Sequence, residues 1–591
     1  MVTPPAHEIL YSENQGEFGM KLRKILAVVL ALALVCATFG ACGNDAGTSS
    51  TSGTSSTTSE TETGNESASE AETGSTGDSS LNIRVGMEPT SLNTLKATYS
   101  QEFATFKHMY ENLYMLDEND VPQPAAAETV DVSEDGMTYT FHLRDDGVWS
   151  NGDPVTANDF AFAWQQALSP EVAADYAYFL FFIKNAEAYL NGTVEWEEVG
   201  VKVIDDLTLE VQLENPTPYA PFLFTFGTLS PINQKFYEEV GADNYGTEAE
   251  YFCTNGAYNL TSWTHDSEIV LTKNPNYHGA DGVAIDTLNM KIISDGQAAL
   301  TSFLAGELDV TEVGTAETLK QAEDAGYEVK SYNDGSSFYL MVNCSDPQLS
   351  NVNLRRALAL GYSKQGFIDV SIGLPYSPMT SFTNPAVNGF DGTSFADALI
   401  AENGGELAPA EGDVEAAKAY LETALSELGI TADQLTLSID CQDSAASQTQ
   451  AAFLQNQWLE NLGIDVTINP KVIKQGSADR QNGNYQMSIT GWGPDYNDPM
   501  TFLDLWVSDG GNNDTRWASE EYDNLIAQAT VETDLEARQE LFYQAEKIIF
   551  DQYMILPLYN RTQSFITSER LATDPLRSTF QDFNYTYATL A

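Results

Sequence analysis

Hydrophobic and polar residues alternate with helical and strand periods throughout the chain after about residue 80. In residues 450–462 the apolar positions share one helical face: Leu454, Trp458, Leu459 and Leu462. Gly463 is expected to end this helix, and residues 464–468 then alternate as a strand. The same order of helix, glycine and strand recurs at 297–310. These switches between two periods predict a mixed α/β fold.

Further helices are predicted from their ends or from their apolar faces. Thr156 and Asp159 form a capping arrangement that opens a helix over 160–168. Long amphipathic helices fit 414–428 and 535–550. No fixed-period repeat is visible, which argues against a solenoid or a propeller. Because no low-complexity linker recurs after residue 80, we expect lobes joined by crossing strands rather than domains on a string.

The long apolar run at residues 25–39 is typical of a secretory signal. Residues 20–24 (MKLRK) give it a positive flank, and small residues follow it before Cys42. Its 15 residues are few for a transmembrane helix, which needs about 20. The small residues before a cysteine resemble the lipobox of bacterial lipoproteins, although Phe39 stands where that motif usually carries an aliphatic residue.

These features divide the first 80 residues into three segments. Residues 1–19 are interpreted as a non-native extension, with Met20 as the initiator, and 20–41 as a lipoprotein signal peptide. Cys42 would then be acylated and become the mature N-terminus. Residues 42–80 are predicted to be a disordered Ser/Thr/Gly/Glu tether, because they contain too little apolar surface to fold. Free secretion and an uncleaved anchor stay open as alternatives.

Composition excludes several functional classes. The 591 residues contain 86 acidic and 27 basic side chains, a formal net charge of −59, so no nucleic-acid partner is expected. Five cysteines and no Cys/His cluster argue against a disulfide scaffold and a zinc site. The nucleophile elbow of serine hydrolases, the glycine-rich phosphate loops and the HExxH zinc motif are absent. No cofactor and no metal are therefore predicted, and an enzyme becomes the less favoured class.

Seven short blocks, spread along the chain after residue 81, carry a resemblance to a known family. They are 87–93 (MEPTSLN), 135–144 (DGMTYTFHLR), 148–160 (VWSNGDPVTANDF), 255–258 (NGAY), 269–277 (IVLTKNPNY), 305–309 (AGELD) and 354–358 (LRRAL). The chain resembles the large, peptide-type (family 5) solute-binding proteins of bacterial ABC importers. The run 491–499 (GWGPDYNDP) is most similar to the oligopeptide-binding branch.

The resemblance implies an α/β, two-lobed, periplasmic-binding-protein-like fold of type II, the large cluster C kind, with an extra subdomain in the first lobe. The hinge would lie where the chain crosses between lobes, near 332–337 and 559–564. The predicted limits are 81–330 plus 560–591 for lobe I, about 110–235 for its inserted subdomain, and 331–559 for lobe II.

The resemblance also implies an oligopeptide held extended between the lobes. In the related branch the aspartate of the Asp-Tyr-Asn run binds the ligand's α-ammonium group, a role that carries over to Asp495; a cation removed from water needs a fixed carboxylate. A turn residue is the competing interpretation of Asp495, because its neighbours favour turns. The ligand would pair with strand segments at 98–100 and 491–493. The further candidate ligand-binding residues are Trp492, Gly491, Gly493, Tyr496, Asn497, Thr98, Tyr99, Ser100, Tyr176 and Tyr559.

Some of these candidates have alternative interpretations. Glycines on both sides of Trp492 are expected to leave room for the ligand backbone. Either Tyr176 or Tyr559 could equally be a buried core aromatic. A basic residue that some relatives place two positions before the Gly-Trp pair is Ile489 here, and a pocket tryptophan expected near 471–473 is missing. Ligand length and side-chain preference therefore stay open.

Three cysteines remain after Cys42. The cysteine that some relatives carry beside Trp492 is Gly493 here. A bond between Cys344 and Cys441 is an open alternative, because both residues end strand-like runs.

The favoured hypothesis is a monomeric, lipid-anchored receptor at the extracellular face of the bacterial cytoplasmic membrane. It would pass oligopeptides to the transmembrane subunits of an ABC permease, whose cytoplasmic ATPases drive uptake. The same fold carrying a dipeptide, an oligosaccharide, a metal chelate or a signalling peptide stays open, as does an extracellular hydrolase. A structural adhesin conflicts with the absence of repeats.

Overall fold

The computed structural model describes residues 79–172, 174–508, 510–579 and 582–591. The predicted extension, the signal peptide, Cys42 and the predicted tether up to residue 78 lie outside these residues. Strand β1 (Ser80–Val85) begins at the last residue of the predicted tether. In the described part of the chain, no helix combines the length and the apolar character that crossing a lipid bilayer would need.

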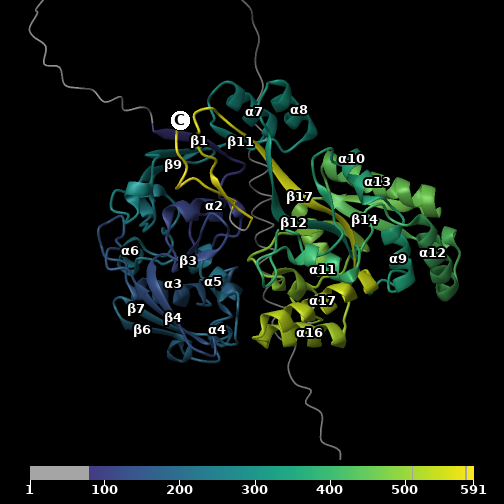
Figure 1. The fold of residues 1–591 in the computed structure, drawn as a ribbon, viewed down its shortest axis with the longest axis horizontal. Coiled ribbons are helices and arrows are strands. Elements are labelled where there is room, and N and C mark those ends of the chain that lie inside the picture. The colour runs from purple at the N-terminus through teal and green to yellow at the C-terminus, as the bar shows by residue number, and fades with distance from the viewer. Residues whose placement is uncertain (1–78, 173, 509, 580–581) are drawn as a thin grey trace, which may run out of the picture. The chain divides into compact units, whose positions relative to one another are not determined.

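One large mixed sheet runs through both lobes (Figure 1). Its central strands, β12 (Lys330–Val342) and β17 (Ile555–Thr567), are antiparallel and 13 residues long each. Beyond β17 follow, in order, β11 (Val310–Glu312), β1, β10 (Thr287–Ile292), β9 (Glu268–Lys273) and β8 (Tyr258–Thr264). Beyond β12 follow β16 (Met487–Trp492), β14 (Leu437–Gln442) and β15 (Val466–Lys471), and β13 (Ser377–Pro378) pairs with β17.

The pairing of β12 with β17 is interrupted by a bulge. Asn333 pairs with Thr562, but the next pair is Ser337 with Asn560, so residues 334–336 leave the ladder. Gly335 supplies the positive φ of 79° that this excursion needs. The predicted hinge segments are these stretches of β12 and β17; their hinge role and the predicted lobe limits stay predictions.

A four-stranded antiparallel sheet lies within the predicted inserted subdomain. Its strands, in order, are β4 (Ala127–Val132), β5 (Thr138–Leu143), β7 (Thr208–Gln212) and β6 (Val201–Asp205). Helix α3 (Ala157–Ala167) packs on it and begins three residues before its predicted start, with the predicted capping pair in place: Thr156 is the N-cap and Asp159 completes a capping box. The Asp159 carboxylate also accepts a hydrogen bond from the Trp149 indole at 3.1 Å, so one side chain fastens the helix start to the preceding loop.

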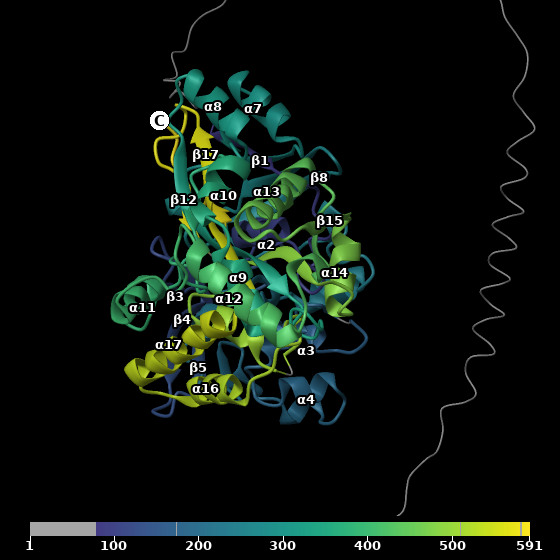
Figure 2. The same ribbon diagram turned by 90° about the vertical axis from the view of Figure 1, so that its right-hand side faces the viewer.

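Helices cover the strands of the second lobe, on the side turned to the viewer in Figure 2. These are α9 (Val352–Leu360), α10 (Lys364–Ser371), α12 (Val414–Leu428) and α13 (Ala445–Leu462). The other helices are α2 (Ser100–Met109), α4 (Ala186–Leu190), α5 (Ala220–Leu223), α6 (Gln234–Val240), α7 (Gly296–Leu304), α8 (Ala316–Asp324), α11 (Phe395–Asn403), α14 (Ile473–Gln481), α15 (Met500–Leu503), α16 (Glu520–Val531) and α17 (Leu535–Gln552). Short hairpins join β2 (Tyr114–Leu116) to β3 (Pro122–Pro124) and β18 (Leu576–Ser578) to β19 (Asp582–Asn584).

The predicted helices are confirmed, with some ends shifted. α12 occupies the predicted residues, and α17 runs two residues beyond its predicted end. α13 starts five residues early, because the Ser444 side chain caps it, and Gly463 ends it with a φ of 68°. β15 begins two residues late and runs through Pro470, which an edge strand tolerates. The prediction for Leu459 is wrong: it is 50% exposed, since it lies about 100° around the helix from buried Trp458.

Candidate functional site

Three neighbouring cavities lie along strand β16 and the loop that follows it. The largest, here called the cleft cavity, has a volume of about 590 Å³. Its walls come from the predicted first lobe at Thr98, Ser100 and Tyr176, from the predicted second lobe at 491–495, and from the bulge of β12. The cleft cavity therefore lies between the lobes, where the resemblance places a ligand.

Two smaller cavities adjoin it. The strand-edge cavity, about 480 Å³, shares Phe338, Gly491 and Arg561 with the cleft cavity. The side pocket, about 230 Å³, shares Trp492 and Asp495 with it. The three cavities thus form a row with the strand-edge cavity at one end and the side pocket at the other.

Strand β16 presents an open edge to this row. β14 pairs with it only at Met487 and Ser488, whereas pairing with β12 continues to Trp492. Within the described chain, the backbone from Ile489 onward therefore has a strand partner on one side only. An open strand edge is a template for an added strand, since its N–H and C=O groups are unpaired.

Asp495 lies at the junction of the cleft cavity and the side pocket. Its backbone N–H donates to Thr501 Oγ1 at 3.0 Å, which fixes the loop after β16. Its carboxylate has no hydrogen-bond or ion-pair partner among the described residues, and burial raises its pKa to about 7. A group of this kind is stabilised by a cation that enters the cavity, because ionisation in a poorly hydrated site otherwise has no compensation.

The residues after Asp495 hold its loop in place. Tyr496, which also lines the side pocket, is 9% exposed. Asn497 lines none of the three cavities, and its Oδ1 accepts a hydrogen bond from the Asn388 N–H at 2.7 Å. Asp498 accepts two hydrogen bonds from the Arg538 guanidinium, at 2.6 and 3.0 Å. These contacts position Asp495 without using its carboxylate.

The prediction of a strand at 98–100 is wrong. This segment leads into α2, and the Glu102 carboxylate accepts the N–H groups of Thr98 at 2.7 Å and Tyr99 at 3.0 Å. Because Glu102 accepts these two hydrogen bonds, the N–H groups of Thr98 and Tyr99 are not available to a ligand backbone. Thr98 and Ser100 line the cleft cavity, whereas Tyr99 is 48% exposed and does not.

The two candidate tyrosines have different surroundings. Tyr176 is half-buried in the wall of the cleft cavity, where burial and the nearby Asp495 charge raise its pKa to about 12. Tyr559 is 5% exposed and stacks on Phe338 and Tyr376, with ring centroids 4.8 and 5.2 Å away. Tyr559 borders the strand-edge cavity, but most of its surface belongs to the core.

The two glycines beside Trp492 also differ. A Cβ on Gly491 would lie 2.8 Å from the ring of Phe338, which already stacks on Tyr559 and lies under Arg561. A Cβ on Gly493 would meet only Ser336 Oγ, at 3.4 Å. Packing within the sheet therefore requires glycine at 491, whereas glycine at 493 leaves space open toward the cleft cavity.

Sequence reasoning missed the charged residues of the two outer cavities. Asp504 lines the side pocket, and its pKa is raised to about 7. Lys471 and Arg480 line the strand-edge cavity, where Lys471 pairs with Asp440 and Asp479 at 2.6 Å. Arg480 bonds Ser477 and has no ion-pair partner in the described chain. The row of cavities is thus acidic at one end and basic at the other.

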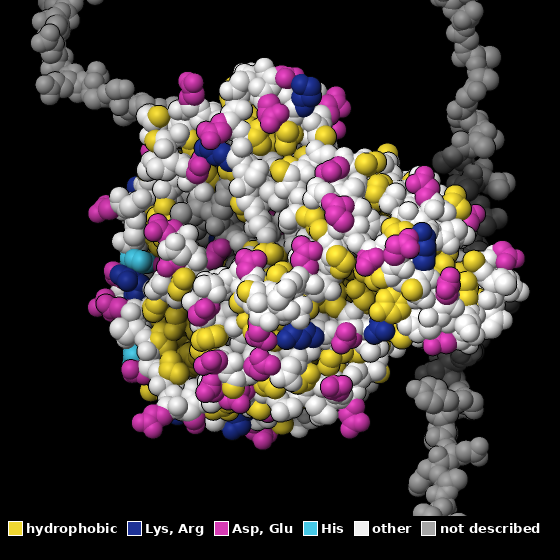
Figure 3. Space-filling model, turned by 45° about the vertical axis from the view of Figure 1, so that its right-hand side comes forward, with side chains coloured by type: hydrophobic (Ala, Val, Ile, Leu, Met, Phe, Trp, Pro, Cys, Tyr) yellow, Lys and Arg dark blue, Asp and Glu magenta, His cyan; other side chains and the backbone are white. Residues whose placement is uncertain are grey.

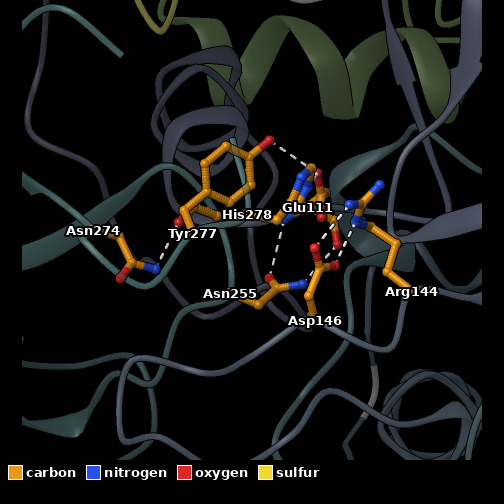
Figure 4. A network of polar contacts seen from close by, with 8 residues as sticks. Glu111, Arg144, Asp146, Asn255, Asn274, Tyr277 and His278 are labelled. Atoms are coloured by element: carbon orange, nitrogen blue, oxygen red, sulfur yellow. Dashed lines mark hydrogen bonds and ion pairs between the residues drawn. The ribbon is translucent and has the colours of Figure 1, made fainter. Parts of the chain in front are cut away.

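A separate polar network joins three of the blocks that carry the family resemblance (Figure 4). The Glu111 carboxylate accepts hydrogen bonds from the Tyr277 hydroxyl at 2.9 Å and from His278 Nε2 at 2.7 Å. The Glu111 backbone exchanges two hydrogen bonds with the Asn255 side chain. Beside them, Arg144 forms an ion pair with Asp146. The cavity among these residues, about 10 Å³, has room for one water molecule. This network holds loops of the first lobe together.

Cysteine and metal chemistry are not evident in the described chain. Cys253, Cys344 and Cys441 are free, so the alternative bond between the last two is not formed. Among the described residues, no three His, Cys, Asp or Glu side chains are grouped so as to hold a metal ion.

Acidic side chains far outnumber basic ones on the face drawn in Figure 3.

Comparisons with known proteins identify the family. The family described as bacterial extracellular solute-binding proteins, family 5 middle, matches residues 121–514. The oligopeptide-binding protein OppA of Bacillus subtilis (strain 168) is 34% identical over 507 residues, which cover 84% of this chain and 90% of that protein. Listeria monocytogenes OppA bound to peptide matches with a TM-score of 0.72 at 30% identity, over 87% of this chain and 100% of that one. Haemophilus influenzae OppA in complex with RPPGFSPFR matches with a TM-score of 0.73 at 28% identity, over 87% and 99%.

The predicted fold class and family are confirmed by these matches. The members of this family are substrate-binding proteins of importers and not enzymes. The chain belongs to the bacterial extracellular solute-binding proteins of family 5.

Proposed function

We propose that this chain is the lipid-anchored, extracellular substrate-binding component of an ABC importer, and that it captures oligopeptides between its lobes. The observation that carries the proposal is Asp495, whose carboxylate lies at the junction of two cavities and has no partner in the described part of the chain. The α-ammonium group is the one cation that every free peptide offers, and it matches this carboxylate. The peptide-bound relative from Listeria supports the same class of ligand.

The open edge of β16 supports an extended ligand. With its first residue at Asp495, a peptide can add as a strand beside residues 489–492, antiparallel to β16. Its carboxylate end then points toward the strand-edge cavity and Arg480. The charges of the row of cavities thus match the charges of a peptide, from ammonium to carboxylate.

The size of the cavities supports a broad choice of sequence. The cleft cavity, at about 590 Å³, falls within the range of about 300–1,000 Å³ that ligand pockets occupy. Main-chain bonds along a strand edge do not depend on side-chain identity. Affinity from the backbone and room for side chains together suit a receptor that accepts many oligopeptides.

Anchoring and delivery complete the proposal. The signal-like residues 20–41 and Cys42 support acylation, which would hold the protein at the outer face of the membrane. Closure of lobe I (81–330 plus 560–591) on lobe II (331–559) would then present a filled, monomeric receptor to the permease. Metabolic labelling with radioactive palmitate, with Cys42→Ser as control, tests the anchor.

Two experiments test the cargo. Native mass spectrometry of freshly purified protein should show retained masses that fit peptides. Calorimetry should show binding of a free pentapeptide and at least tenfold weaker binding of its N-acetylated form, because acetylation removes the ammonium group. Equal affinity for the two forms would refute the role of Asp495, and retained sugars would replace peptides as the cargo.

A further inference from the structure

The side pocket beyond Asp495 is not needed to bind a peptide backbone. Its walls are mostly aromatic, with Tyr178, Phe179, Phe182 and Tyr219 around it. Its volume of about 230 Å³ lies below the range of about 300–1,000 Å³ of whole-ligand pockets. The pocket therefore has the size of a single large side chain and not of a second ligand.

Asp504 brings a second carboxylate into this pocket. It follows α15, and its side chain has no hydrogen-bond or ion-pair partner among the described residues. The side chain is exposed, so water inside the pocket reaches the carboxylate. The desolvating effect of the protein around the pocket, together with the charges of Asp495 and Asp498, raises the pKa of Asp504 to about 7.

Arg538, whose guanidinium lies over Tyr219 in the pocket wall, pairs with Asp498 and not with Asp504. Arg538 donates two bonds to Asp498 and a third, from Nε, to the Ala529 carbonyl at 2.8 Å. It also lies 5.6 Å from the ring centre of Tyr219. Three of its N–H groups thus bond to the loop and to α16, and the residues that line the pocket include two carboxylates and no basic side chain.

The position of the pocket relates it to one part of a bound peptide. Trp492 and Asp495 belong to the walls of both the cleft cavity and the side pocket. A peptide whose ammonium group contacts Asp495 therefore has the side chain of its first residue at the entrance to the pocket. Aromatic walls accept the aliphatic stem of a long basic side chain, and their ring faces attract its cationic head.

We propose that the side pocket binds the side chain of the peptide's first residue and prefers arginine or lysine, with Asp504 as the partner of the cationic head. This inference rests on the proposed function, because it needs a peptide ammonium at Asp495. A neutral side chain would displace water from Asp504 without offering a charge in return. A basic one supplies that charge.

Calorimetry with matched peptides tests the preference. The peptides are Arg-Ala-Ala-Ala-Ala and the same sequence beginning with citrulline, the neutral analogue of arginine. The wild type should bind the arginine peptide about tenfold or more tightly than the citrulline peptide. This ratio should fall to about threefold or less in Asp504→Asn, and it should persist in the control Glu460→Gln, an exposed carboxylate on α13 outside all three cavities.

The outcomes separate this inference from the proposed function. Equal binding of the arginine and citrulline peptides by the wild type overturns the preference, and this comparison needs no variant. A ratio that persists in Asp504→Asn overturns the role of Asp504. If the arginine and citrulline peptides bind equally tightly and N-acetylation weakens the binding of both, the peptide receptor stands and the side-pocket inference fails. If no peptide binds, the proposed function fails first.

Discussion

Tyr219 of the predicted first lobe and Tyr496 of the predicted second lobe lie face to face, with ring centroids 4.6 Å apart and ring planes within 3°. Tyr219 precedes α5 in the predicted inserted subdomain, and Tyr496 follows Asp495 directly. The stack therefore joins the predicted lobes beside Asp495, whose carboxylate has no partner among the described residues. We infer that it stabilises the arrangement in which the lobes enclose a ligand.

Replacing one ring of this stack should speed ligand release. In Tyr219→Ala the contact between the lobes is lost, and aromatic pairs of this kind contribute about 0.5–1.5 kcal/mol beyond their buried area. We expect peptide dissociation, measured by stopped-flow fluorescence, to become about 2- to 12-fold faster. Tyr219→Phe keeps the stacked ring, so this variant should release peptide at nearly the wild-type rate. Tyr189→Ala removes a pair with Trp196 inside the subdomain and serves as the control. An unchanged rate in Tyr219→Ala would show that the stack does not hold the lobes.

Neutralising Asp495 should remove the anchor for the peptide amine. Asp495→Asn keeps the shape of the side chain and loses its charge, so peptides with free N-termini should bind about 2–5 kcal/mol more weakly. N-acetylated peptides should bind the variant no more weakly than they bind the wild type. The ligand-free variant should also unfold at a higher temperature, because a poorly hydrated charge is removed. Calorimetry and thermal unfolding measure both effects, and an undiminished affinity for free peptides would contradict the first.

Peptide affinity should fall in acid. The Asp495 pKa of about 7 refers to the empty site, and a bound ammonium group favours the ionised carboxylate, so binding below pH 7 releases a proton. The amine itself stays protonated below about pH 7.7. Affinity should therefore fall roughly 20-fold from pH 7.5 to pH 5.5.

Other groups around Asp495 shape this pH dependence. Asp504, Asp498, Tyr176, Tyr178 and Tyr496 all interact with its charge or lie beside it, and Asp504 titrates in the same range, so the midpoint belongs to the pair. In the ligand-free protein the sign is opposite: the raised pKa makes the contribution of Asp495 to stability fall as pH rises from about 4 to about 7. Calorimetry in two buffers of different ionisation enthalpy measures proton release. If peptide affinity of the wild type did not change with pH, the coupling between binding and proton release would be refuted. In Asp495→Asn the part of the proton release that comes from Asp495 should be absent.

Arg480 should matter only for peptides that reach it. In Arg480→Gln, a peptide long enough to enter the strand-edge cavity loses a charged partner for its carboxylate, which should cost about 1–2 kcal/mol. A C-terminally amidated peptide of the same length and a dipeptide should show little change. Lys547→Gln, whose partner Glu402 lies outside the row of cavities, is the matched control. Equal losses for free and amidated peptides would argue against this end of the path.

Alanine substitutions at the two glycines beside Trp492 should have different effects, one on the stability of the protein and the other on peptide binding. In Gly491→Ala the new methyl group collides with Phe338, so the free energy of unfolding should drop by about 1–3 kcal/mol. In Gly493→Ala the methyl group enters open space, so stability should change little, while peptide binding weakens. Denaturant unfolding and calorimetry on the two variants check this. The reverse pattern would mean that the ligand backbone approaches Gly491 and not Gly493.

The sequence alone determined the elements whose signals are local. Capping by Thr156 and Asp159, the stop at Gly463 and the apolar stripe of α12 each depend on residues within a few positions, so they are visible along the chain. The family was also visible, because its blocks are continuous. Some of those blocks meet at Glu111 and hold the first lobe together, which ties their residues to the fold more than to a ligand.

Only the tertiary structure decided which groups face the ligand. Glu102 accepts hydrogen bonds from the N–H groups of Thr98 and Tyr99, and the ring of Phe338 leaves room only for glycine at 491. Neither contact can be recognised from the order of residues in the sequence. α14 and α15 flank β16 in the chain, but that Arg480 and Asp504 line cavities at opposite ends of one row follows from how these elements pack against distant residues such as Tyr559 and Tyr219. Such relations depend on how distant elements pack, and side-chain periodicity describes only which face of an element is buried.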